Sequence, residues 1–71
     1  MKETITELLK EKRIPELYHL FEEMAPADIA EQLKRFEDEK LPVLYRLLPK
    51  DIAAEVFVEM EADEQEFLIQ S

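Results

Sequence analysis

The sequence contains neither glycine nor asparagine. Tight β-hairpin turns need residues that adopt a positive φ, and glycine and asparagine are the usual choices. No segment alternates apolar and polar residues over the length of a strand, whereas apolar residues recur at helical spacing along the whole chain. We therefore expect an all-α fold.

Four prolines mark the places where helices should begin, because the first turn of a helix tolerates a residue that lacks an N–H. Each proline stands at the start of an apolar stripe with helical spacing, and Thr4 with Glu7 has the pattern of a capping box for an earlier helix. The polar run 37–40 is expected to form a turn. The pattern predicts about six short helices, near residues 4–12, 15–24, 26–36, 41–48, 49–60 and 63–70.

The predicted helices repeat. Residues 14–20 (IPELYHL) match residues 41–47 (LPVLYRL), and residues 26–30 (PADIA) match residues 49–53 (PKDIA). A repeat of this length is typical of stacked helix pairs, none of which can bury its apolar face alone. We expect residues 1–71 to form a single helical-repeat domain, part of a longer N-terminal domain, whose open ends could also allow a homo-oligomer. The equivalent Tyr18 and Tyr45 should cover the stack with their rings and leave their hydroxyl groups in water.

The composition excludes several functions. Eighteen acidic and nine basic residues give a formal charge of −9, which disfavours nucleic acids and anionic lipid surfaces and suits cations or basic partners. There is no cysteine and only one histidine, no segment has the roughly 18–20 consecutive apolar residues of a membrane helix, and no nucleophile motif or glycine-rich loop is present. We expect a cytoplasmic module that is not an enzyme, without direct membrane insertion and without nucleic acid as a partner.

The negative charge is concentrated at the C-terminal end. No basic residue follows Lys50, and seven acidic residues lie in positions 51–71. Asp51, Glu55 and Glu59 are spaced i, i+4, i+8, which puts them on one helix face. Magnesium prefers oxygen ligands and often uses only one or two carboxylates, so these three residues are the candidate metal ligands of a weak Mg²⁺ site. The alternative is an acidic face that is simply solvated.

Residues 24–33 (MAPADIAEQL) and 47–56 (LLPKDIAAEV) resemble the cytosolic N-terminal domain of MgtE-type magnesium transporters, and the similarity extends over about residues 4–71. The resemblance implies a right-handed, armadillo-like superhelical stack on the cytosolic face of the plasma membrane, followed in the parent transporter by CBS domains and a transmembrane pore. It also implies that Mg²⁺ bound between the acidic N domain and a CBS domain gates the pore. One ligand of the family corresponds to Glu55.

Two functions therefore remain open. The first is a regulatory magnesium-sensing domain of a magnesium transporter, with Mg²⁺ shared with a domain outside this chain. The second is a helical-repeat module that binds proteins and no metal, since the middle region of the flagellar motor-switch protein FliG has a related superhelix. Selectivity for magnesium over sodium at equal ionic strength separates the two.

Overall fold

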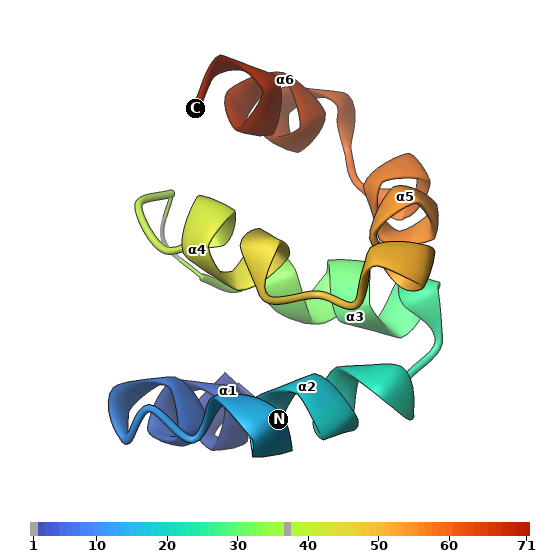
Figure 1. The fold of residues 1–71 in the computed structure, drawn as a ribbon. Coiled ribbons are helices and arrows are strands. Elements are labelled where there is room, and N and C mark those ends of the chain that lie inside the picture. The colour runs from blue at the N-terminus through green and yellow to red at the C-terminus, as the bar shows by residue number, and fades with distance from the viewer. Residues whose placement is uncertain (1, 37) are drawn as a thin grey trace.

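The computed structural model describes residues 2–36 and 38–71. These residues form six helices and no strand, which confirms the all-α prediction (Figure 1). The helices are α1 (Lys2–Lys10), α2 (Ile14–Glu22), α3 (Pro26–Leu33), α4 (Leu41–Arg46), α5 (Lys50–Glu59) and α6 (Ala62–Gln70).

The prolines stand where the helices start. Pro26 is the first residue of α3, and Pro15 and Pro42 are the second residues of α2 and α4. Pro49 is the residue immediately before α5, so this helix begins one position later than predicted. Residues 38–40 form part of the predicted turn, and Glu37 lies outside the described residues.

The predicted capping box at Thr4 is wrong. Helix α1 already includes Lys2 and Glu3, so Thr4 lies inside the helix and cannot cap it. Glu3 in the first turn interacts favourably with the helix dipole, which allows the helix to begin earlier. A capping-box contact occurs at α6 instead, where the backbone N–H of Glu61 donates to Oε1 of Glu64 at 3.2 Å.

Helix α1 ends at Lys10, two residues before the predicted end, because the chain turns at a lysine with positive φ. Lys12 has φ = 60°, the left-handed conformation that glycine usually supplies at this position. The N–H of Lys12 donates to the carbonyl of Leu9 at 3.1 Å, and the N–H of Arg13 donates to the carbonyl of Leu8 at 2.9 Å. These two bonds define a Schellman motif, so the chain turns sharply between α1 and α2 without glycine.

One hydrophobic core joins the helices from α1 to α5. Ile5, Leu17, Phe21, Ile29, Leu33, Leu44 and Val56 are fully buried, and no charged side chain is buried among the described residues. Helix α6 contributes no buried residue; its Phe67 and Leu68 pack only partly against the core. The last helix is therefore the one most weakly attached through apolar contacts.

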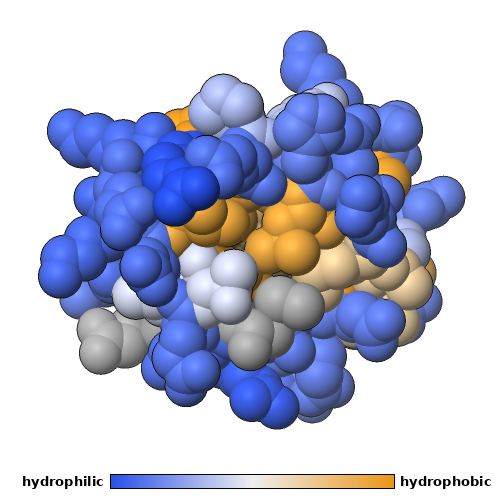
Figure 2. Space-filling view, turned by 90° about the horizontal axis from the view of Figure 1, so that it is seen from below, coloured by the Kyte–Doolittle hydropathy of each residue, from blue (hydrophilic) through white to orange (hydrophobic). Residues whose placement is uncertain are grey.

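The helices are layered along the molecule. Figure 1 shows α1 and α2 at one end, α3 and α4 in the middle, and α6 at the opposite end. The two helices that share the repeated Pro-x-Asp-Ile-Ala sequence, α3 and α5, pack against each other. This arrangement fits a small helical stack, and its right-handed superhelical winding remains a prediction. Viewed from the α1–α2 end, the surface is mostly hydrophilic around a central apolar area (Figure 2).

The two equivalent tyrosines have different environments. Tyr18 is 40% exposed, as predicted. The expectation for Tyr45 is wrong, because its hydroxyl donates to the carbonyl of Ala53 at 2.9 Å and its ring meets Phe57 edge-on, with centroids 6.3 Å apart. Burial raises the pKa of the Tyr45 hydroxyl. The difference arises because α5 packs beside Tyr45 and supplies the acceptor carbonyl.

Candidate functional site

The three predicted ligands lie on the surface of α5. Asp51 is in the first turn, and Glu55 and Glu59 follow at one and two turns towards the C-terminal end. All three side chains are exposed. With a rise of 1.5 Å per residue, Asp51 and Glu59 are separated by about 12 Å along the helix axis, whereas Glu55 and Glu59 are separated by about 6 Å. One ion can therefore contact the second pair and not all three residues.

The structure divides the three residues between two surface grooves. Glu55 and Glu59 line a shallow groove with Val58 and with residues 25–27 at the start of α3. Asp51 lines a different groove, together with Arg46 and Lys50. The neighbours of Glu55 and Glu59 are thus apolar side chains and the positive end of a helix dipole, while Asp51 has two cations beside it.

The start of α3 offsets part of the charge of Glu55 and Glu59, but α5 itself does not. Helix α5 has no basic residue in its last turn, and Glu59 lies at the negative end of its dipole. Within residues 2–36 and 38–71, no ion pair involves Glu55 or Glu59. A bound cation would relieve the repulsion between these carboxylates and the dipole.

The next group of acidic residues is partly neutralised by a lysine that the sequence analysis missed. Nζ of Lys34, just after α3, lies 3.2 Å from Oε2 of Glu61 and 3.8 Å from Oε1 of Glu31. The pocket around Lys34 is also lined by the carboxylates of Asp38, Asp63 and Glu64. The hydrogen bond that Lys34 donates to Glu61, together with the charges of nearby carboxylates, raises the pKa of Lys34. No feature of the sequence links position 34 to position 61, since the contact depends on how α6 folds back.

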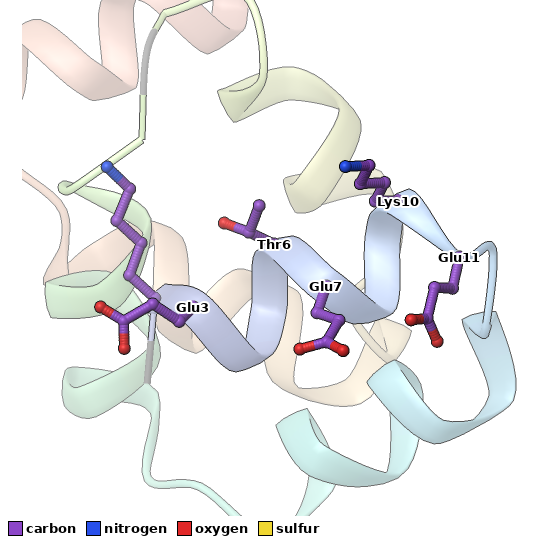
Figure 3. A pocket seen from close by; sticks show the side chains of 6 residues that line it. Glu3, Thr6, Glu7, Lys10 and Glu11 are labelled. Carbon is purple, nitrogen blue, oxygen red and sulfur yellow. The ribbon is translucent and has the colours of Figure 1, made fainter.

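A further depression runs along a single face of α1. It is lined by two rows at helical spacing, with Glu3, Glu7 and Glu11 in one row and Lys2, Thr6 and Lys10 in the other. In Figure 3 the three carboxylates of the first row project to the same side of the helix. Acidic and basic rows lie side by side here, so this face has less uncompensated charge than the end of α5.

The residues present suit part of a magnesium site. In the described part of the chain, no three His, Asp or Glu side chains converge so that they could hold a metal ion. Glu55 and Glu59 nevertheless provide exposed oxygen ligands one helical turn apart, and Mg²⁺ commonly takes one or two carboxylates and completes its octahedral shell with water or other ligands. The donor chemistry fits the ion, and the remaining ligands must come from elsewhere.

Comparison with known families decides which family the chain belongs to. The sequence model of the MgtE intracellular N domain matches residues 24–71, about two thirds of the chain. The chain belongs to this family. No curated protein matches it in a sequence comparison.

The MgtE N-domain match includes α3 to α6 and therefore all three predicted ligands, while α1 and α2 lie before it. It confirms the resemblance inferred from residues 24–33 and 47–56 and assigns the chain to a domain of magnesium transporters. None of the helices in the described residues is long and apolar enough to span a membrane.

Proposed function

We propose that this chain is a regulatory, magnesium-sensing and non-catalytic domain of a magnesium transporter. Mg²⁺ binds between the acidic face of α5 and an acidic CBS domain of the parent protein, and this contact holds the transmembrane pore closed. When intracellular magnesium falls, the ion leaves, the two acidic faces repel each other, and the pore opens. The domain acts on the cytoplasmic side of the membrane.

The observation that carries the proposal is the position of Glu55 and Glu59. They are exposed and one helical turn apart, and Glu59 is the last residue of a helix whose dipole adds to its negative charge. A cation between two acidic faces removes the repulsion at close contact, which makes their contact dependent on the ion concentration. Glu55 is also the residue that corresponds to a ligand in MgtE-type transporters.

Asp51 has a secondary place in this proposal. It lies in a groove with Arg46 and Lys50, and these cations would compete with a divalent ion for its carboxylate. Glu55 and Glu59 are therefore the principal ligands that the chain contributes. Because two carboxylates do not fill an octahedral shell, binding by the chain alone should be weak, with water in the remaining positions.

The alternative is a helical-repeat interaction module that binds no metal, like the FliG superhelix. The observation in its favour is the exposure of large apolar side chains, with Val58 73% and Ile69 74% exposed. Exposed apolar side chains belong to a protein interface when they form part of a contiguous apolar patch. Under this alternative, the carboxylates of α5 would serve only for solubility or for contact with a basic partner.

The test is magnesium-dependent closure of the intact transporter that carries this domain. Glu55→Gln should shift half-maximal closure to higher intracellular magnesium, because one ligand charge is lost while the side chain keeps its size. Glu7→Gln, on α1, is the matched control with the same change in net charge, and it should leave closure unchanged. Equal magnesium sensitivity of the Glu55→Gln and wild-type transporters would refute the proposal.

A further inference from the structure

The groove that contains Asp51 differs in charge from the groove of Glu55 and Glu59, because it contains cations. It is formed where α2 meets the connection between α4 and α5, and it is lined by Ile14, Tyr18, Arg46, Leu47, Leu48, Lys50 and Asp51. Ile14 and Tyr18 remain 36% and 40% exposed, and Arg46 and Lys50 are both exposed. The groove thus combines an apolar lining with two cations and the carboxylate of Asp51, an excess of one positive charge on a protein whose formal charge is −9.

Helix α6 has the complementary surface. Seven of the nine excess negative charges lie in residues 51–71, and α6 contains Asp63, Glu64 and Glu66 without any basic residue. Ile69 and Gln70 are three and four positions after Glu66 and therefore lie on the same side of the helix as Glu66. Ile69 is 74% exposed, so this side of α6 presents an apolar side chain next to a carboxylate.

From this complementarity we infer that the groove is a docking site for α6 of a second copy of the chain. Ile69 packs against Ile14 and Tyr18, and the carboxylate of Glu66 faces Arg46 and Lys50. The groove and the outer side of α6 are different surfaces of one molecule, so the contact is heterologous and joins copies head to tail. The pairing does not involve Glu55 or Glu59 and does not depend on magnesium.

Because long-range repulsion opposes the local attraction, the association should be weak and should depend on salt and protein concentration. Two chains with a charge of −9 repel each other at long range, but salt at physiological concentration screens this repulsion beyond about 8 Å. The local attraction between the groove and α6 acts at contact distance and adds to the burial of Ile69. Association should therefore be detectable at high protein concentration in physiological salt.

Sedimentation equilibrium of the 71-residue chain in EDTA tests the inference, because EDTA removes any divalent bridge. The wild-type chain should show concentration-dependent association. Ile69→Ser should weaken it about tenfold or more, as expected for the loss of one buried apolar side chain. Val58→Ser is the matched control, since Val58 is 73% exposed on α5 and lies outside both docking surfaces, and it should have no effect.

A charge exchange distinguishes this contact from other modes of association. One variant carries Arg46→Glu and Lys50→Glu in the groove, and the other carries Glu66→Lys and Gln70→Lys on α6. Neither should associate with itself, but mixing the two should restore association, because the intact α6 of the first fits the intact groove of the second and the exchanged charges of the other pair are again opposite. A wild-type chain that is monomeric at all concentrations, or association that ignores these substitutions in folded variants, would overturn the inference.

Discussion

Lys34 and Glu61 are 27 positions apart in the chain, and their side chains meet at 3.2 Å between Nζ and Oε2. Lys34 directly follows α3, and Glu61 directly precedes α6. Within the described residues, α6 itself makes one side-chain hydrogen bond to another helix, from Nε2 of Gln65 to the carbonyl of Phe57 in α5, at 2.6 Å. Because α6 has no buried residue, these polar contacts and the partly buried Phe67 and Leu68 hold it in place.

Lys34→Met should therefore loosen α6 selectively. The amides of α6 should exchange with solvent faster than in the wild type, while those of α3 and α5 change little, because opening of α6 does not require the core to unfold. Arg35→Met is the matched control, since it removes the same charge from the neighbouring position. Hydrogen exchange measured by NMR would show the difference, and equal protection of α6 in both variants would contradict it.

The same contact predicts a response to alkaline pH. The pKa of Lys34 is raised in the folded protein, chiefly by its hydrogen bond to Glu61, so folding favours the protonated lysine. This stabilisation is fully present below the ordinary lysine pKa of about 10.4 and is lost as the pH rises through the higher pKa of the folded state. The carbon chemical shifts of α6 can be measured at alkaline pH without amide protons. They should show that α6 loosens as the pH rises above about 10.4 in the wild type, and they should change less in Lys34→Met.

Lys12→Gly should stabilise the protein. Lys12 has φ = 60°, a conformation that costs a residue with a Cβ roughly 1 kcal/mol and costs glycine almost nothing. The greater entropy of glycine in the unfolded chain offsets part of the gain, so an increase of about 0.5 kcal/mol in the free energy of unfolding is expected. Urea denaturation measures it, and Lys12→Ala, which keeps the Cβ, should not reproduce the gain.

Tyr45→Phe should destabilise the protein by about 0.5–1.5 kcal/mol, the usual worth of one hydrogen bond, because the carbonyl of Ala53 loses its donor. Tyr18→Phe, at the equivalent repeat position but 40% exposed, should be nearly neutral. Urea denaturation of both variants tests this contrast. Equal effects at the two positions would mean that the bond to Ala53 contributes nothing to stability.

The core should respond to truncation in proportion to burial. Leu44 on α4 is fully buried, whereas its neighbour Val43 is 45% exposed. Leu44→Ala should lower the free energy of unfolding by about 2–5 kcal/mol, which threatens folding in a chain of this size. Val43→Ala should stay within about 0.5 kcal/mol. Thermal unfolding of both variants, with thermal unfolding of the wild type as reference, distinguishes them.

Local features of the sequence predicted most of the helices. Pro26 and Pro42 restrict where α3 and α4 can start, and the apolar spacing after them is sufficient to indicate the buried face. Features that depend on tertiary contacts escaped prediction. The hydroxyl of Tyr45 finds its acceptor only because α5 packs beside α4, and Lys12 takes a conformation for which its sequence gives no signal.

At the candidate site, too, the sequence predicted local features but not those that depend on tertiary contacts. The spacing of Asp51, Glu55 and Glu59 predicts one face of α5, and all three are exposed on this helix, but they line two different grooves. It could not predict that α2 would close a groove over Arg46, Lys50 and Asp51, nor that Lys34 at the end of α3 would neutralise Glu61. Both facts depend on the packing of helices that are distant in the sequence. Both favour Glu55 and Glu59 as the metal ligands.

An amide NMR titration of the chain with magnesium chloride, matched in ionic strength by sodium chloride, tests the magnesium proposal most directly. We expect saturable shifts centred on Glu55, Glu59 and the start of α3, abolished by Glu55→Gln and retained in Glu7→Gln. Shifts no larger than those caused by sodium, or equally spread over all acidic residues, would contradict a magnesium site on this face of α5.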